Sequence, residues 1–322
     1  MEVIRDRSTI LLPTPRVNRA ISRIIAQRGI KTVAFGAAAP LGWMSAKLRR
    51  AGATRIIALT HGHEVWWSKV FPFNLIVRRI GSQSDSLTYL GEFTRNAIAG
   101  ALSKRSADSM VKIAPGIDVD HFKPVDATEL RRKLKLDEKK IIVSVGRLVH
   151  RKGQDFLIES MPSILAQEPN AHLLLVGEGP YRQHLQKLVS KHALDANVTF
   201  IGRIQYNELP IYICAGDIFA MPSRSRFAGL EVEGLGIVYL EASACGLAVV
   251  AGASGGAPDA VVEGVTGFVV DGTSCTEISQ RVVELLADEK LRQRMGAAGR
   301  EWITNEWRWQ IWASKFAQLL AG

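Results

Sequence analysis

The sequence predicts an α/β fold of two domains, each built on a parallel sheet with helices on both faces. Two observations carry this prediction. Short β-branched or aliphatic runs alternate with longer amphipathic stretches along most of the chain. The length of 322 residues exceeds one ordinary domain but suits two. Hydrophobic residues at 47% and charged residues at 22% are typical of a globular protein and exclude a disordered one.

The elements can be assigned in order along the chain. We expect strands over residues 32–35, 55–59, 140–144, 172–176, 198–201, 218–221 and 248–251, and helices over 154–166, 181–192, 277–286 and 307–320. The charged segment 125–140 interrupts the alternation and marks the boundary between domains. The predicted domains are therefore 1–124 and 125–305, and a final helical segment, 306–322, is expected to pack back on the first domain.

Charge is distributed unevenly between the two halves. Residues 1–120 contain 18 Lys and Arg against 8 Asp and Glu, whereas residues 121–322 contain 23 of each kind. A one-sided basic surface attracts phosphates, either of nucleic acid or of anionic lipid headgroups. A solvated basic face without any partner is the alternative.

The cysteines indicate a reducing compartment. Cys214, Cys245 and Cys275 are odd in number, widely spaced and form no CxxC pair. This pattern argues against a disulfide framework or a zinc site, and it predicts a cytoplasmic protein.

A glycine-rich turn between two glutamates is the sharpest motif. In Gly229-Leu-Glu-Val-Glu-Gly-Leu-Gly-Ile-Val-Tyr-Leu-Glu241, the turn 234–236 lies between Glu233 and Glu241 and opens an expected helix at Ile237. The free N–H groups and the positive dipole at a helix start bind phosphate, and glycine lets a ligand approach the backbone. We expect Glu241 to reach a ribose diol and Glu233 a sugar hydroxyl.

Basic residues follow the first expected strand of the same domain. Arg147 and Lys152 lie at the carboxyl end of the strand 140–144, where ligands bind in open α/β sheets. Arginine makes bidentate contacts with phosphate and lysine supplies a mobile charge; two solvent-facing bases are the alternative. His61 occupies a similar place after the strand 55–59, although a lone histidine is more often structural.

An aromatic and basic segment follows His61. Trp66, Trp67 and Lys69 are followed by two phenylalanines and then by Arg78 and Arg79. Aromatic rings at the headgroup level and bases on anionic phosphates are typical of peripheral membrane attachment. Core aromatics flanked by surface bases are the alternative.

Together these residues resemble the retaining GT-B glycosyltransferases of family four. The resemblance covers essentially the whole chain, and its most specific part is the run from Gly229 to Ala242. The other matching motifs are Gly36-Ala-Ala-Ala-Pro40, Thr60-His-Gly-His-Glu64, Arg151-Lys-Gly-Gln154, Phe219-Ala-Met-Pro222 and Gly252-Ala-Ser-Gly-Gly-Ala-Pro258. The resemblance implies two Rossmann-like domains that face each other across a cleft.

The resemblance also implies a role for each candidate residue. His61 would lie beside the transferred sugar, Arg147 and Lys152 would hold the diphosphate, and Glu233 would hold mannose hydroxyls. Glu241 would bind the ribose. The remaining implied donor contacts are the backbone amides of Gly236, Ile237 and Val238, for phosphate and sugar, and the loop with Arg203 and Ile204, for guanine.

The implied reaction transfers mannose with retention from GDP-mannose to a phosphatidylinositol mannoside at the inner face of the plasma membrane. Arg147 and Lys152 would stabilise the charge of the leaving diphosphate, whose phosphate takes the proton of the acceptor hydroxyl. These two cations do the work of a divalent ion, so no metal or other cofactor is expected. Asp118 and Asp120 have the spacing of a DxD metal motif, but they lie in a loop that resembles the interdomain connection of the family.

Several alternatives stay open. Another glycolipid or a small polyol would serve as acceptor with the same donor chemistry, and the contacts alone do not choose GDP over UDP. Nucleic acid is not expected, because the bases are not interleaved with a known binding motif. Members of the family begin with a strand and a Gly-Gly loop, and nothing similar precedes Glu2-Val-Ile-Arg5. The first domain is therefore expected to lack its first strands and to expose a sheet edge, and a non-catalytic nucleotide-sugar-binding remnant is a further alternative.

Overall fold

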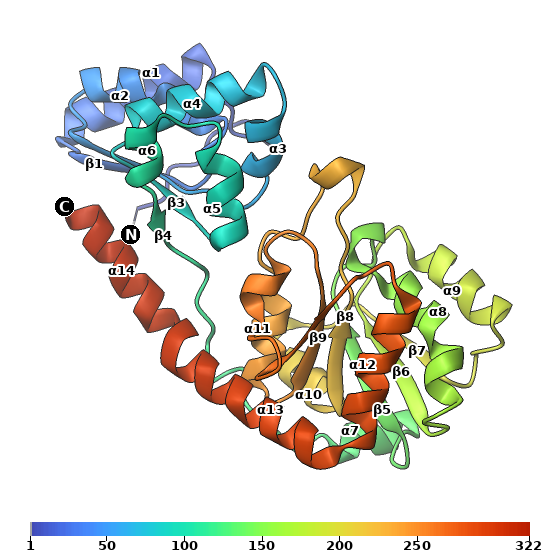
Figure 1. Cartoon of the computed structure of the whole chain (residues 1–322). Coiled ribbons are helices and arrows are strands. Elements are labelled where there is room, and N and C mark those ends of the chain that lie inside the picture. Colours follow the sequence, from blue (N-terminus) through green and yellow to red (C-terminus); the bar gives the residue numbers. More distant parts are fainter. Residues whose placement is uncertain (1) are drawn as a thin grey trace. The chain divides into compact units, whose positions relative to one another are not determined.

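The computed structural model describes residues 2–322, which form two compact units, each built on a parallel sheet (Figure 1). The first unit comprises the residues up to Ala114 together with Trp312–Gly322, and the second comprises Pro115–Ile311. The α/β fold with two parallel sheets is therefore confirmed. Within residues 2–322, no helix combines the length and the apolar character needed to cross a membrane.

The first unit has a four-stranded sheet in the order β1-β2-β3-β4, and every pairing is parallel. Its strands are β1 (Thr32–Phe35), β2 (Arg55–Ala58), β3 (Ser86–Tyr89) and β4 (Val111–Lys112). Its helices are α1 (Pro15–Arg28), α2 (Ser45–Arg50), α3 (Glu64–Lys69), α4 (Phe73–Gln83), α5 (Glu92–Ala99) and α6 (Lys104–Asp108), with a short 3₁₀ turn at Leu41–Met44.

Local sequence signals explain where α1 begins and ends. The Thr14 side chain accepts a hydrogen bond from the N–H of Val17, and Pro15 occupies the first helical position, where its missing N–H costs nothing. Gly29 ends the helix with a φ of 62°, a conformation that favours glycine. The buried face of the helix, with Val17 and Ile25, packs into the core of the first unit.

β1 is an edge strand of the described part of the chain. Among residues 2–322 it pairs only with β2, and Ala34 is exposed on it. The end of α14 (Trp309–Ala321) is bonded to the same two strands. The Thr32 hydroxyl donates to the Leu320 carbonyl at 3.3 Å, and Arg55 Nε donates to the Leu319 carbonyl at 2.8 Å.

The second unit has a six-stranded parallel sheet in the order β10-β9-β8-β5-β6-β7. Its strands are β5 (Lys140–Val145), β6 (Ala171–Val176), β7 (Val198–Gly202), β8 (Ile218–Met221), β9 (Ala248–Gly252) and β10 (Gly267–Val270). Its α-helices are α7 (Thr128–Leu134), α8 (Gln154–Leu165), α9 (Arg182–Lys191), α10 (Leu209–Cys214), α11 (Ile237–Ala244), α12 (Cys275–Ala287) and α13 (Glu289–Trp302). Shorter turns occur at His150–Lys152, Tyr206–Glu208, Phe227–Gly229, Ala257–Ala260 and Ile303–Trp307.

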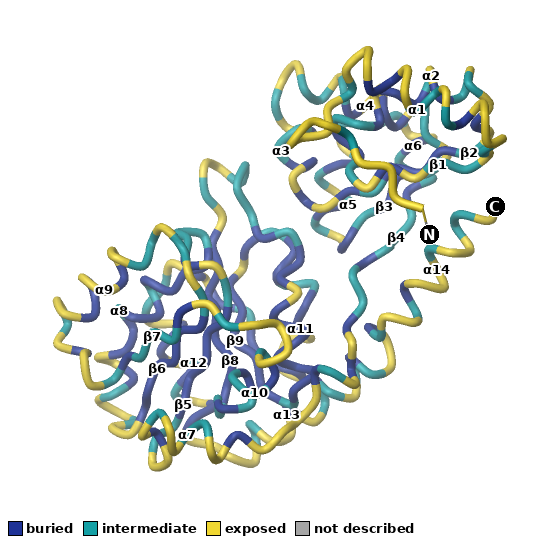
Figure 2. The backbone as a smooth tube through the Cα atoms, turned by 180° about the vertical axis from the view of Figure 1, so that it is seen from behind, coloured by how far each residue is buried: buried dark blue, intermediate teal, exposed yellow. Residues whose placement is uncertain are grey.

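Both faces of this sheet are largely buried: β6, β8 and β9 are buried along their whole length, whereas the edge strand β7 is of intermediate burial over residues 199–201, as the colours of Figure 2 show. Side chains alternate between the faces, so Ile142 of β5 packs in one cluster with α8, α9 and α12. Its neighbours Ile141 and Val143 are also buried but lie outside that cluster, on the face that α10, α11 and α13 cover. Burial on both faces explains the nearly continuous aliphatic runs of the sequence.

Three strands, β3, β4 and β10, were not predicted from the sequence. β4 has only two residues, and β3 mixes polar with apolar residues as Ser86-Leu-Thr-Tyr89. Such short strands are specified by the neighbours with which they pair, and their own sequences carry little periodic signal.

The units divide at Ala114 and Pro115, whereas the sequence pattern placed the boundary in the segment 125–140. That segment contains α7 of the second unit. Residues just after Pro115 also belong there, because Arg300 donates to the carbonyls of Val119 at 2.9 Å and Phe122 at 2.6 Å.

Candidate donor site and sugar-side histidine

The strand order of the second sheet reverses at its centre, and the candidate site lies there. β5 has β6 and β7 on one side and β8, β9 and β10 on the other. Ligands of open parallel sheets bind at the carboxyl ends of the strands beside such a reversal. Arg147 and Lys152 follow β5, and Glu231 and Glu233 follow β8, so basic and acidic candidates come from the two strands that meet at the reversal.

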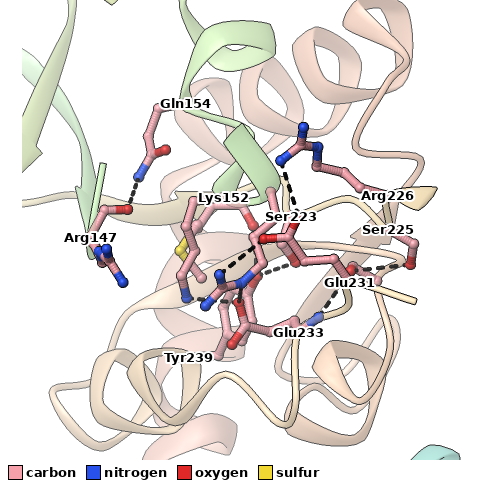
Figure 3. A network of polar contacts seen from close by, with 12 residues as sticks. Arg147, Lys152, Gln154, Ser223, Ser225, Arg226, Glu231, Glu233 and Tyr239 are labelled. Carbon is pink, nitrogen blue, oxygen red and sulfur yellow. Dashed lines mark hydrogen bonds and ion pairs between the residues drawn. The ribbon is translucent and has the colours of Figure 1, made fainter. Parts of the chain in front are cut away.

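Lys152 and Glu233 form a buried ion pair in this site (Figure 3). Lys152 Nζ lies 2.7 Å from Glu233 Oε2, and each residue is 8% exposed. Arg151 Nη1 lies 3.4 Å from Glu231 Oε1, and its Nε lies 4.0 Å from Glu233 Oε2. Arg226 Nη1 lies 3.0 Å from Glu231 Oε2. Three cations therefore surround two carboxylates, an arrangement that favours an added anion.

Arg147 adds a fourth cation that is not neutralised. It is exposed, and no carboxylate of residues 2–322 forms an ion pair with it. Its carbonyl accepts a hydrogen bond from Gln154 Nε2 at 3.5 Å, which fixes the backbone at its position. Figure 3 shows the side chains of Arg147 and Lys152 on the same side of the segment that follows β5.

Close backbone packing fixes the position of Lys152. The next residue, Gly153, has a φ of 74°, and a β-carbon there would overlap the carbonyl oxygen of Pro222. The N–H of Arg224 also donates to the carbonyl of Arg151 at 2.8 Å. The segment after β5 is thus held directly against the segment after β8.

A second buried ion pair joins the same two segments. Arg224 donates through two nitrogens to Asp155 at 2.7 and 2.6 Å, and both residues are buried. Burial alone favours the neutral acid, but the bonds and charge of Arg224, with the bond from the Tyr181 hydroxyl, outweigh it and lower the pKa of Asp155. The carboxylate therefore anchors the first turn of α8 to the loop of the acidic candidates.

α11 directs its positive end to this edge of the sheet. Gly236 precedes its first residue with a φ of 75°, and a β-carbon there would overlap the ring of Tyr239. No side chain caps the helix, so its first N–H groups lack helical partners. Glu241 lies on the second turn and is 8% exposed; burial raises its pKa to about 7, against the charge of Lys152. Ile237 is 40% exposed and Val238 is buried.

The motif after β9 holds the backbone of Glu233. The Ser254 hydroxyl accepts a hydrogen bond from the N–H of Glu233 at 3.2 Å, and the Glu233 carbonyl accepts one from the N–H of Gly256 at 2.8 Å. Three strand ends, those of β5, β8 and β9, therefore determine where this carboxylate lies.

Arg203 and Ile204 follow β7, the edge strand, on the same edge of the sheet. Among the described residues they make no side-chain hydrogen bond or ion pair with Lys152 or Glu233. The structure therefore brings together four predicted side chains and the start of α11, namely Arg147, Lys152, Glu233 and Glu241. The loop predicted to line guanine follows β7, which is separated from β5 by β6.

His61 lies in the first unit, where the segment after β2 meets the segment after β1. Its Nε2 contacts the carbonyl oxygen of Gly36, and its N–H donates to Glu64 Oε2 at 2.9 Å. Since Gly36 contributes a carbonyl, Nε2 carries the hydrogen and Nδ1 is the nitrogen with a free lone pair. The imidazole is exposed.

The aromatic and basic segment divides between core and surface. Trp66 and Trp67 are half-buried, and their ring centroids lie 4.7 and 5.1 Å from that of Phe73. Phe71, in contrast, is 76% exposed and Leu75 is 53% exposed. Trp66 and Trp67 pack on each other and on Phe73, as the alternative of core aromatics expects, and their contact with a membrane stays a prediction.

The bases of this segment are exposed, as predicted. Lys69 ends α3, and Arg78 and Arg79 lie on α4. The guanidinium of Arg79 lies 4.8 Å from the ring centroid of Trp43, which is 43% exposed. The exposed apolar residues beside the bases are therefore Trp43, Phe71 and Leu75.

Asp118 and Asp120 lie in a turn. Asp118 Oδ1 accepts the N–H groups of Asp120 and His121, each at 3.1 Å. In residues 2–322, no group of three or more His, Cys, Asp or Glu side chains is arranged to hold a metal ion.

Sequence reasoning missed three charged residues of the site. Arg151, Glu231 and Arg226 join the ion-pair network although none was assigned a role. One signal was available, because Glu231 and Glu233 are two residues apart and side chains with that spacing share one side of an extended segment.

Comparisons with known proteins identify the family of the chain. Residues 126–302 match the family described as glycosyl transferases group 1. The chain is 46% identical over 322 residues to the "GDP-mannose-dependent alpha-(1-6)-phosphatidylinositol monomannoside mannosyltransferase" of Mycobacterium tuberculosis, covering 99% of this chain and 83% of the relative. A Corynebacterium glutamicum relative, a "GDP-mannose-dependent monoacylated alpha-(1-6)-phosphatidylinositol monomannoside mannosyltransferase", is 44% identical, with 99% and 84% covered.

Solved structures show the same fold. The structure of Anabaena HepE in complex with UDP superposes with a TM-score of 0.84 at 19% identity, covering 95% of this chain and 82% of that one. Sucrose-phosphate synthase from Thermosynechococcus elongatus gives 0.79 at 26% identity, with 95% and 76% covered. The fold class and the family that the sequence motifs indicated are confirmed, and the chain belongs to the glycosyl transferases group 1 family.

Proposed function

We propose that this protein transfers mannose from GDP-mannose to a phosphatidylinositol mannoside, with retention of configuration. The observation that carries the proposal is the cluster at the strand reversal, where cations outnumber carboxylates beside the uncapped start of α11. A diphosphate fits this cationic cluster. The names of the two mannosyltransferase relatives suggest mannose as the sugar, guanine as the nucleobase and a phosphatidylinositol mannoside as the acceptor.

In this proposal the cations stabilise the leaving group. Arg147 contacts phosphate oxygens through its planar fork, and Lys152 adds a point charge. The N–H groups of Gly236, Ile237 and Val238 bind the phosphate and the sugar at the helix start. Negative charge that grows on the diphosphate during transfer meets preorganised positive groups. The leaving phosphate accepts the proton of the acceptor hydroxyl, so the reaction needs neither a protein base nor a metal ion.

The ion pair of Lys152 with Glu233 has a part in this scheme. Lysine has three N–H donors, so Lys152 binds a phosphate without losing Glu233 completely. Glu233 then has an oxygen free for a mannose hydroxyl. Glu241 accepts hydrogen bonds from the ribose, and the loop with Arg203 and Ile204 lines the guanine.

Calorimetric titration with GDP tests the donor site. Arg147→Ala and Lys152→Ala should each weaken binding by about 1.5–3 kcal/mol, the contribution of hydrogen bonds to charged groups. Lys187→Ala is the matched control, since Lys187 is an exposed lysine of α9 in the same unit. Unchanged affinity in both site variants would show that the diphosphate binds elsewhere.

We further propose that the first unit attaches the protein to the inner face of the plasma membrane. The excess positive charge lies in residues 1–120, and exposed Phe71 and Leu75 adjoin Lys69, Arg78 and Arg79. Each base near an anionic surface contributes about 1 kcal/mol, within a Debye length.

Vesicle sedimentation tests this attachment. Reversal of Lys69, Arg78 and Arg79 to Glu should release the protein from vesicles that contain phosphatidylinositol, and high salt should do the same to the wild type. Reversal of Lys133 and Lys135, exposed lysines of the second unit, is the control. Equal binding to neutral and anionic vesicles, or to neither, would contradict the proposal.

A further inference from the structure

A buried carboxylate lies beside His61. Glu64 is the first residue of α3 and is only 1% exposed. The space next to it is lined mainly by apolar side chains, among them those of Val77, Ile80 and Leu87. An ionised carboxylate in such surroundings is costly unless hydrogen bonds and an opposite charge compensate it.

The two oxygens of Glu64 have different partners. Oε2 accepts the N–H of His61 at 2.9 Å. Oε1 lies 3.1 Å from Nε2 of His63 and has no hydrogen-bond partner among the described residues. The same nitrogen lies 3.1 Å from the carbonyl oxygen of Ala39. Because both neighbours are acceptors, the hydrogen of His63 is on Nε2, and its hydrogen bond goes to Ala39.

These contacts join two loops at the carboxyl ends of neighbouring strands. Gly36 and Ala39 follow β1, whereas His61, His63 and Glu64 follow β2. Gly36 determines the ring orientation of His61, and Glu64 determines the position of its backbone. His63 connects the same carboxylate to the first loop.

We propose that Glu64, in contact with His63, is a positioning residue that holds His61 so that Nδ1 is free to accept a hydrogen bond from a sugar hydroxyl. The proposal rests on the proposed role of His61 beside the transferred sugar. Glu64 itself touches no substrate. It acts through the backbone of His61 and through the connection between the two loops.

Substitutions that separate charge from hydrogen bonding test the proposal. Glu64→Gln keeps an oxygen for the N–H of His61, so kcat should stay within about threefold of wild type. Glu64→Ala removes that oxygen and should lower kcat by about tenfold to a hundredfold, the size expected when a reacting group is displaced. The KM for GDP-mannose should change by less than about twofold in both variants. Glu92→Ala is the control, since Glu92 begins α5 in the same unit and is exposed.

A second readout does not depend on catalysis. Imidazole ¹⁵N shifts report the tautomer of His61, which should be the Nε2–H form in wild type and in Glu64→Gln, and a mixture in Glu64→Ala. An unchanged tautomer and unchanged kcat in Glu64→Ala would overturn the proposal. If Glu64→Ala does not fold, His63→Gln replaces it. That variant removes the imidazole that contacts Glu64 Oε1 and Ala39, and it should also produce a mixed His61 tautomer; an unchanged tautomer there would equally overturn the proposal.

The two proposals can fail separately. Wild-type transfer by His61→Ala would remove the role of His61 in the reaction. The tautomer in the Glu64 variants would still decide whether Glu64 positions that ring.

Discussion

Glu241→Gln should raise the stability of the folded protein at pH 8 and weaken its binding of GDP. In the folded protein, burial raises the pKa of Glu241 from 4.5 to about 7. The unfolded chain therefore loses this proton near pH 4.5, whereas the folded protein keeps it until about pH 7. Stability falls with rising pH across that interval and is constant above it. The difference corresponds to about 3 kcal/mol at pH 8.

Glutamine cannot ionise, so the variant should lack this loss. Urea unfolding at pH 5 and pH 8 measures it: the variant should be more stable than wild type by up to about 3 kcal/mol at pH 8, and nearly equal at pH 5. The comparison cancels other titrating groups that both proteins share. Glu301→Gln, on an exposed position of α13, should show no difference at either pH.

The same substitution should weaken GDP binding, because a ribose hydroxyl donates more strongly to a carboxylate than to an amide oxygen. Wild-type affinity should also rise between pH 6 and pH 8 as Glu241 ionises, and the variant should lose this dependence. A variant that is destabilised at pH 8, or one that binds GDP with unchanged affinity and pH dependence, would refute the reasoning.

Three further predictions concern the rest of the second unit. Burial lowers the pKa of His172 to about 4, so the unfolded chain binds a proton near pH 6.5 that the folded protein does not. The free energy of unfolding therefore falls as pH drops from 6.5 to 4, and in His172→Gln urea unfolding should show a smaller fall over this range. Gly153→Ala should destabilise the protein by at least about 1–2 kcal/mol, since the left-handed conformation and the Pro222 carbonyl both oppose a β-carbon; thermal unfolding measures this, and an unchanged Tm would contradict it. EDTA should leave transfer intact, and rescue by Mg²⁺ after inhibition by EDTA would point to Asp118 and Asp120 as ligands.

The second unit was the more predictable part of the fold. Its strands are mostly buried on both faces, and aliphatic runs such as Leu173–Val176 appear in the sequence as uninterrupted apolar segments. The first unit has strands of two to four residues, which carry less signal. Its boundary was misplaced, because the residues after Pro115 pack on Arg300 of α13, a contact that no local pattern reveals.

Residues of the candidate site were predicted where a charged side chain follows an expected strand or a glycine-rich turn. Arg147, Lys152 and Glu233 stand at strand ends or beside a glycine turn, and both features are visible in the sequence. The ion pair of Lys152 with Glu233, 81 residues further along the chain, depends on the order of β5 and β8 in the sheet. Glu64 was quoted only as part of a motif, because its importance comes from burial and from its contacts with His61.

Packing between neighbouring side chains decides which aromatic residues face solvent. Trp66 and Phe71 have the same character in the sequence, but only Phe71 is largely exposed, since Trp66 packs on Phe73. Composition therefore predicted a basic surface, and the structure shows which of its aromatic residues are exposed.

The most direct test of the proposed function is to incubate the purified protein with GDP-mannose, EDTA and vesicles that contain phosphatidylinositol monomannoside, and to determine the anomeric configuration of the product by NMR. The account predicts one α-linked mannose added per GDP released. Binding of GDP without transfer, or a β-linked product, would contradict it.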